Sequence, residues 1–155
     1  MKRLTCVLAM ALGVVALATI PVLADNEVGT VTGAIAGLFA GGATLAGVSL
    51  DGLEVGMGLF ISSDGSATGE FQTVLLSNSV FGRQIAVEGK VTTGAVAPGG
   101  QANFGGTATV DLGDGTPPLL GVPFSVAATA DSLVLVLDAI NLPAALVTKG
   151  AVTID

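Results

Sequence analysis

The chain has 155 residues, with twelve Asp and Glu against five Lys and Arg, a formal net charge of −7. It contains no His, Trp or Tyr, and a single Cys. The absence of His excludes Ser-His-Asp and Cys-His nucleophile systems, and zinc and most transition metals lack their usual ligands. The acidic balance argues against nucleic acid as a partner, because the phosphate backbone is also negative. We therefore expect neither a cofactor nor a nucleic-acid partner.

The first 24 residues have the layout of a secretory signal peptide. The layout consists of a basic pair, an apolar stretch, a helix breaker and a small residue at the cleavage point: Lys2-Arg3, Leu4–Ile20, Pro21 and Ala24. The apolar stretch is short for a membrane-spanning helix, which needs about 20 residues. We expect cleavage after Ala24 and export of residues 25–155 to the periplasm or the medium. A cut after Ala18 and an uncleaved anchor are the alternatives.

The exported part is expected to be one acidic domain without disulfides. Its basic residues are Arg83, Lys90 and Lys149, whereas all twelve acidic residues lie after Ala24. It lacks a basic cluster that would hold it on anionic lipid, so we expect no membrane association. Cys6 lies within the signal peptide. Glycine is abundant, together with Val, Leu, Ile and Ala, and this composition is typical of many strands joined by glycine turns.

Residues 25–50 form a glycine-rich segment that allows two interpretations. Gly29, Gly33, Gly37 and Gly41 recur at four-residue spacing, which on a helix would make a small-residue face for close packing in a membrane. The alternative is two strands, 29–36 and 43–50, joined by a turn at Gly41-Gly42. We favour the strands, because Val and Thr residues recur in both halves.

Residues 51–155 show the signals of a main β core. Apolar or alternating runs predict strands at Val55–Ser62, Ala67–Ser77, Gln84–Thr93, Ala102–Leu112, Gly121–Thr129, Leu133–Leu137 and Val147–Ile154. Turn residues separate them, beginning with Asp64-Gly65, which is a hairpin signal. The alternation slips near Gly89, which predicts a bulge there, and a second bulge or turn is expected at Lys149-Gly150.

Three of these strands make sharper predictions. Ala102–Leu112 alternates cleanly, so one of its faces should be buried. Pro123 requires an edge, a bulge or a position without a ladder hydrogen bond. Leu133–Leu137 is apolar at every position, which predicts burial on both faces at the centre of the core. The whole pattern predicts an all-β, single-domain antiparallel sandwich or barrel of about eight to ten short strands.

The stretch TATVDLGDGTPPLLGVPFSV, residues 107–126, and the upstream VEGKV, residues 87–91, resemble a group of uncharacterised secreted bacterial all-β domain proteins. The resemblance covers roughly residues 65–154. It implies a secreted β fold and supplies no catalytic or binding residues. The glycine-rich segment lies outside it.

Carboxylates are the remaining chemical groups. Asp111 and Asp114, which flank Gly113, and Asp64 in its serine-rich loop are weak candidates for binding calcium through hard oxygen ligands. The simpler interpretation is that these Asp side chains stabilise turns by accepting hydrogen bonds from their own backbone.

A paired-carboxylate hydrolase would need two carboxyl groups roughly 5–9 Å apart. Its candidates are Glu54, Glu70, Glu88 and Asp111, and the simpler interpretation is again a solvated strand face. We expect instead no enzymatic activity and a secreted β module with a structural or surface-interaction role. An exposed strand edge would meet its partner. The alternatives are a membrane-associated protein that assembles through a Gly-zipper at residues 28–50, and a carboxylate-dependent hydrolase.

Overall fold

The computed structural model describes residues 28–79 and 82–155, so the expected signal peptide at residues 1–24 lies outside the described part. Within that part the chain is all-β. The strands are β1 (Gly29–Leu45), β2 (Val48–Ile61), β3 (Ser66–Ser77), β4 (Ile85–Ala97), β5 (Gln101–Asp111), β6 (Leu119–Ala128), β7 (Ser132–Leu137), β8 (Ile140–Asn141) and β9 (Ala145–Ile154). No helix able to cross a membrane is found among the described residues.

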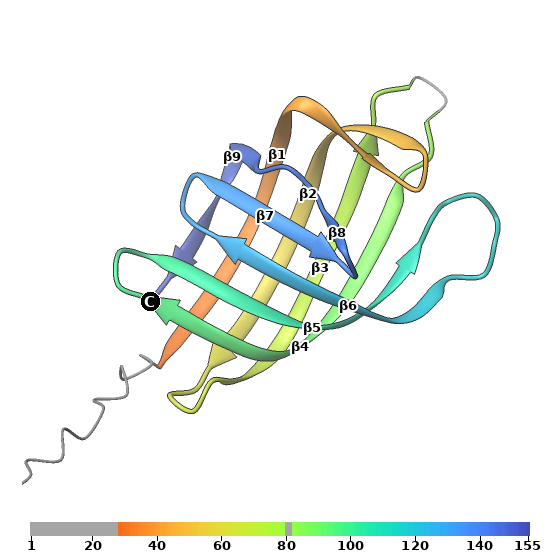
Figure 1. The fold of residues 1–155 in the computed structure, drawn as a ribbon. Helices are drawn as coiled ribbons and strands as arrows, with labels where there is room; N and C mark the ends of the chain where they lie inside the picture. Colours follow the sequence, from red (N-terminus) through yellow and green to blue (C-terminus); the bar gives the residue numbers. More distant parts are fainter. Residues whose placement is uncertain (1–27, 80–81) are drawn as a thin grey trace, which may run out of the picture.

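The strands form one antiparallel sheet that closes into an eight-stranded barrel (Figure 1). Each strand from β1 to β7 pairs with the next, and β9 closes the wall by pairing with both β1 and β7. The short β8 pairs with the same strand, β7, as the start of β9. Together β8 and β9 therefore act as one interrupted wall strand. Of the two predicted architectures, sandwich and barrel, the chain adopts the barrel.

The glycine-rich segment forms strands, and the Gly-zipper helix is wrong. β1 pairs with β2 along its length, and the hairpin turns at Ala46-Gly47 rather than at Gly41-Gly42. Gly41 and Gly42 instead form a bulge inside β1, with φ of +94° and +76°. A four-residue spacing is also a multiple of the two-residue period of a strand, so Gly29, Gly33 and Gly37 share one face of β1, whereas Gly41 lies in the bulge. The spacing that suggested a helix is therefore equally compatible with a strand.

The face shared by these glycines is turned into the barrel, where Val31, Ile35 and Phe39 of the same strand are buried. At Gly37 an added Cβ would lie 3.3 Å from the Cβ of Ala145 and 3.5 Å from Cδ1 of Leu53. The missing side chain thus lets its neighbours fill the interior.

Three phenylalanines occupy the centre of the barrel. The ring of Phe71 lies 5.8 Å from that of Phe104, edge to face, and 5.5 Å from that of Phe124 in a stacked arrangement. Such pairs add about 0.5–1.5 kcal/mol each beyond their burial. Gly89 faces inward, and a Cβ there would lie 2.7 Å from Cε1 of Phe124. Inward burial continues through Gly89 to Val91, so the bulge predicted at Gly89 is wrong.

The bulge in β4 falls at Thr92, where the register with β5 shifts. The predicted irregularity near Lys149-Gly150 is confirmed, since the register of β9 against β1 slips next to Lys149 and Gly150 has φ of +86°. Pro123 lies just outside the β6–β7 ladder, which begins at the next residue, and its carbonyl accepts a hydrogen bond from the Asp138 N–H at 2.8 Å.

The strand β7 is not buried on both faces as predicted. Leu133, Leu135 and Leu137 are buried, but Val134 and Val136 are only partly buried. Only the inner face of a barrel is buried, and side chains alternate between the two faces of a strand. Every second residue of an all-apolar strand therefore points outward. The phenylalanine cluster, rather than β7, is the centre of the core.

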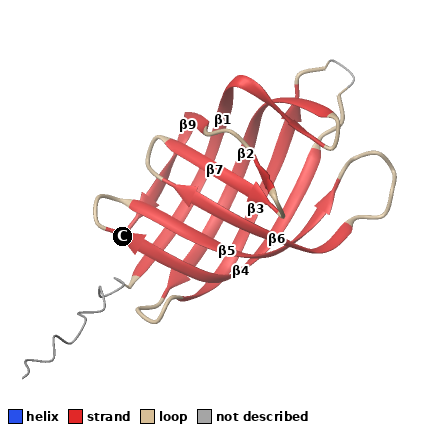
Figure 2. Ribbon diagram, in the orientation of Figure 1, coloured by secondary structure: helices blue, strands red, loops and turns tan. Residues whose placement is uncertain are grey.

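The two ends of the barrel differ (Figure 2). We call one end the base, with the β2–β3, β4–β5 and β6–β7 turns at residues 62–65, 98–100 and 129–131. We call the other end the mouth, with the β1–β2 turn at 46–47, residues 78–79 and 82–84, the β5–β6 loop at 112–118 and the β7–β8 turn at 138–139. The alternating direction of the strands places each set of connections together.

Candidate functional site

An apolar cavity of about 370 Å³ opens at the mouth, between the β1–β2 turn and strands β5 to β8. Its floor consists of Leu45, Val110 and Leu137, the buried side chains near the mouth ends of β1, β5 and β7. Leu112 and Val122 are partly buried. They form the wall of the cavity together with Pro123 of β6. Because the phenylalanines and leucines below fill the barrel, the cavity is confined to the mouth.

The rim of the cavity is also apolar, although it faces solvent. Leu119 is 51% exposed and Ile140 is 46% exposed, and both line the cavity. Leu120, the next residue of β6, is 78% exposed. Asp138 is the one charged residue in the lining. The mouth therefore combines a dry floor with apolar side chains that remain in contact with water.

The β5–β6 loop, which leads into the rim residues of β6, is held by Asp side chains. Asp111 accepts a hydrogen bond from the Gly113 N–H at 2.8 Å. Asp114 accepts two hydrogen bonds from Thr116, from the N–H at 3.0 Å and the hydroxyl at 2.5 Å. Arg83 lies 3.1 Å from Asp114 and ties the loop to the segment before β4. The Thr116 hydrogen bonds, hydroxyl first, and then the Arg83 charge lower the pKa of Asp114.

Asp64 has the same arrangement at the base. It accepts hydrogen bonds from the Ser66 hydroxyl at 2.6 Å and the Ser66 N–H at 2.9 Å, and these lower its pKa. The three weak calcium candidates are thus divided between the two ends, with Asp111 and Asp114 at the mouth. The described residues contain no group of three or more His, Cys, Asp or Glu that could hold a metal ion.

The four hydrolase candidates lie on the outer wall, on neighbouring strands. Of these, the register brings together Glu70 and Glu88, because Glu70 is opposite Lys90 and Glu88 is opposite Gln72. Such diagonal neighbours have Cα atoms about 7–8 Å apart. Glu54 lies one strand further on, in β2, and Asp111 lies at the mouth end of β5. In the described part of the chain, the carboxylates of Glu54, Glu70 and Glu88 take part in no hydrogen bond or ion pair.

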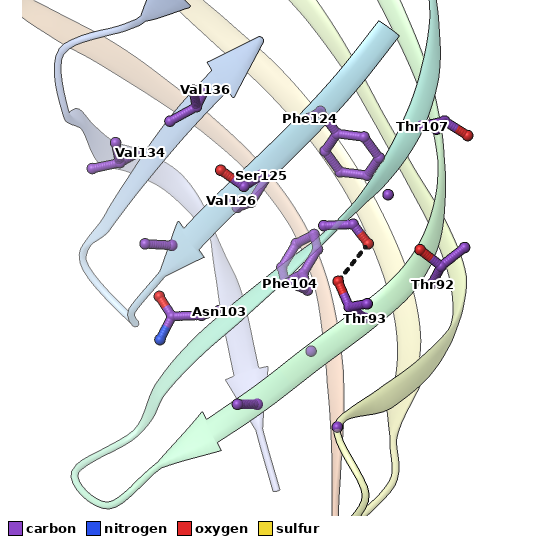
Figure 3. A pocket seen from close by; sticks show the side chains of 16 residues that line it. Thr92, Thr93, Asn103, Phe104, Thr107, Phe124, Ser125, Val126, Val134 and Val136 are labelled. Carbon is purple, nitrogen blue, oxygen red and sulfur yellow. Dashed lines mark hydrogen bonds between the residues drawn. The ribbon is translucent and has the colours of Figure 1, made fainter. Parts of the chain in front are cut away.

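A second hollow, of about 750 Å³, lies on the outer face of β4 to β7 (Figure 3). We call it the outer groove. Its lining is uncharged, with Val134 and Val136 on one side and polar residues such as Asn103 and Ser125 beside them. The Thr93 hydroxyl donates to the Gly105 carbonyl at 3.4 Å. The partly buried Val134 and Val136 of β7 supply apolar surface to this groove.

Sequence reasoning missed both hollows. One signal for the mouth was present, because Leu119-Leu120 directly follows Pro117-Pro118, at a loop where polar residues are expected. The cavity itself depends on which strand ends meet, and this cannot be obtained from any single segment.

Comparison of the chain with protein-family models, with curated proteins and with solved structures gives no match. The resemblance to secreted bacterial β-domain proteins therefore stays a prediction. The function has to be argued from the geometry of the barrel.

Proposed function

We propose that the protein is an exported, non-enzymatic binding module that holds a small apolar molecule in the mouth of its barrel. The observation that carries this proposal is the apolar cavity with an exposed apolar rim, in a chain with a formal net charge of −7. Scattered apolar residues on a surface are ordinary, but a group of them around a concave site marks a place for a ligand.

The size of the cavity supports this function. Small-molecule sites usually have volumes of roughly 300–1,000 Å³, and the mouth cavity has about 370 Å³. Small eight-stranded barrels either fill their interior with side chains or hold one small ligand. Here the lower interior is filled by Phe71, Phe104 and Phe124, so a ligand would lie at the mouth. Covering apolar rim surface is favourable by about 25 cal/mol per Å².

The absence of catalytic activity is inferred from the barrel interior. Thr73 is the one buried polar residue among the described residues, and its hydroxyl donates to the Glu54 carbonyl at 2.9 Å. Acid–base catalysis needs a titratable group positioned against the substrate. Asp138 is the sole ionisable residue that lines the mouth cavity, and it is exposed. The proposed export depends on the predicted signal peptide.

A surface-interaction role without a small ligand is the second candidate, favoured by the uncharged outer groove. A partner at an exposed strand edge has less support. Closure of the barrel leaves β9 from Thr148 to Ile154 with β1 on one side and no described strand on the other. This stretch carries Lys149 and the bulge, both of which are devices that block strand addition.

The test uses a neutral fluorescent probe, N-phenyl-1-naphthylamine, with protein purified after expression of the full chain. Val122→Phe fills the wall of the mouth cavity and should weaken probe binding at least about tenfold. Val134→Phe is the matched control, since Val134 is a partly buried valine like Val122 but lines the outer groove. It should leave binding unchanged.

Thermal unfolding of both variants shows whether each is folded. If Val134→Phe loses probe binding and Val122→Phe keeps it, the site lies in the outer groove instead. Binding that neither substitution changes would contradict the proposal.

A further inference from the structure

We infer that the mouth selects uncharged or cationic amphiphiles over anionic ones that carry the same apolar chain. This inference rests on the proposed function, because it specifies the head group of the ligand held in the mouth cavity. It follows from the distribution of charge around the apolar cavity at the mouth.

Asp138 is the charged residue among those that line the cavity. It directly follows Leu137, which forms part of the floor, and its own side chain is exposed at the rim. Its backbone is fixed, because its N–H donates to the Pro123 carbonyl at 2.8 Å and its φ is +54°. Pro123 and Asp138 both line the cavity, so this hydrogen bond fixes the backbone of Asp138 within the site.

The basic residues cannot offset this charge. Arg83 is at the mouth, but its guanidinium is 3.1 Å from Asp114 and is already neutralised. Lys90 lies in β4 on the outer wall, opposite Glu70. Lys149 lies in β9, opposite Ala36 of β1. These three are all the basic residues after the signal peptide. Asp111, Asp114 and Asp138 therefore leave the mouth with a negative charge.

An apolar chain that enters this cavity leaves its head group at the rim, beside Asp138. An anionic head group would be repelled there by the carboxylate and by the net charge of the protein. An uncharged head group would feel neither repulsion, and a cationic one would be attracted. Because the rim is exposed, salt should weaken the discrimination.

The experiment measures displacement of bound N-phenyl-1-naphthylamine by 1-decanol, decylamine and decanoate, at pH 7 and low salt. Decanol and decylamine should displace the probe, and decanoate should be weaker by about tenfold. Added salt should reduce this difference in affinity between decanoate and the other two ligands. Decanoate binding as tightly as decanol would overturn the inference and leave the proposed function standing. Failure of all three ligands, with probe binding unaffected by Val122→Phe, would instead overturn the proposed function.

The role of Asp138 is tested by Asp138→Asn. Asn tolerates a positive φ, so the backbone should be retained. The variant should reduce the ratio of decanol affinity to decanoate affinity several-fold. Asp131→Asn is the matched control, since Asp131 is an exposed residue in the β6–β7 turn at the base. It should change neither affinity. If Asp138→Asn leaves the difference in affinity between decanol and decanoate unchanged, the proposed role of Asp138 is wrong.

Discussion

The base and the mouth are built from the same strands, yet they differ in packing. At the base the turns are short, and Ile61 and Ala67 pack closely against the backbone of Gly94, where an added Cβ would lie 3.0 Å from Ile61. At the mouth the β5–β6 loop is longer, and Leu119 and Ile140 remain half-exposed around a cavity. The comparison suggests that the base supplies stability, while the mouth keeps apolar surface available for binding.

The largest expected effect tests where the stability resides. Ile61→Ala removes a fully buried side chain at the base and should lower the free energy of unfolding by about 2–5 kcal/mol. Leu119→Ala, at the mouth, should change it by no more than about 0.5 kcal/mol, because half of that side chain is already exposed. Urea unfolding monitored by circular dichroism measures both. Equal losses would remove the distinction between the two ends.

Filling space should have opposite consequences at the two ends. Gly94→Val adds atoms where Ile61 and Ala67 leave no space, and overpacking of this kind costs about 1–3 kcal/mol. Val122→Phe adds more atoms at the mouth, where the cavity can accept them, and should leave the melting temperature unchanged or higher. Calorimetry on the two variants decides the point. A large destabilisation by Val122→Phe would mean that the cavity is rigid and closed to a ligand.

The smallest expected effect compares the two Asp-capped turns. Asp64 and Asp114 have lowered pKa values in the folded protein, so each stabilises the fold above its unfolded pKa of about 3.9 and loses this contribution as pH falls through the lowered value. Asp64→Asn and Asp114→Asn should therefore destabilise slightly at pH 7, and the destabilisation should shrink as the pH falls through the lowered pKa values. Arg83 assists Asp114 alone. Added salt should consequently reduce the Asp114→Asn effect and not the Asp64→Asn effect, as measured by urea unfolding.

The predicted strands were largely correct because their signals are local. Ala102–Leu112 alternates, and the structure buries Phe104, Ala108 and Val110 as expected. The Asp64-Gly65 hairpin also follows from neighbouring residues alone. By contrast, the bulge at Thr92 depends on how β4 meets β5, and this pairing is not visible within either segment.

The candidate site was harder to predict than the fold, for a related reason. The Asp residues examined for calcium are conspicuous in the sequence, but each caps its own turn. The cavity is formed instead by ordinary residues such as Leu45, Val110 and Leu137, which meet only when distant strand ends are brought together. Leu119-Leu120 was the one local sign, and it does not indicate where its partners lie.

Pairing of the first described strand with the last has a consequence for how the barrel assembles. Val31 is opposite Ile154, and Thr30 and Asp155 exchange backbone hydrogen bonds of 2.8 and 3.0 Å. The hairpins between neighbouring strands can form early, but this join brings together segments separated by nearly the whole described chain. Contacts between such distant segments slow folding. Until β1 and β9 pair, each has an unpaired edge that a second, incompletely folded copy could bind. Correct folding should therefore be more efficient at low protein concentration.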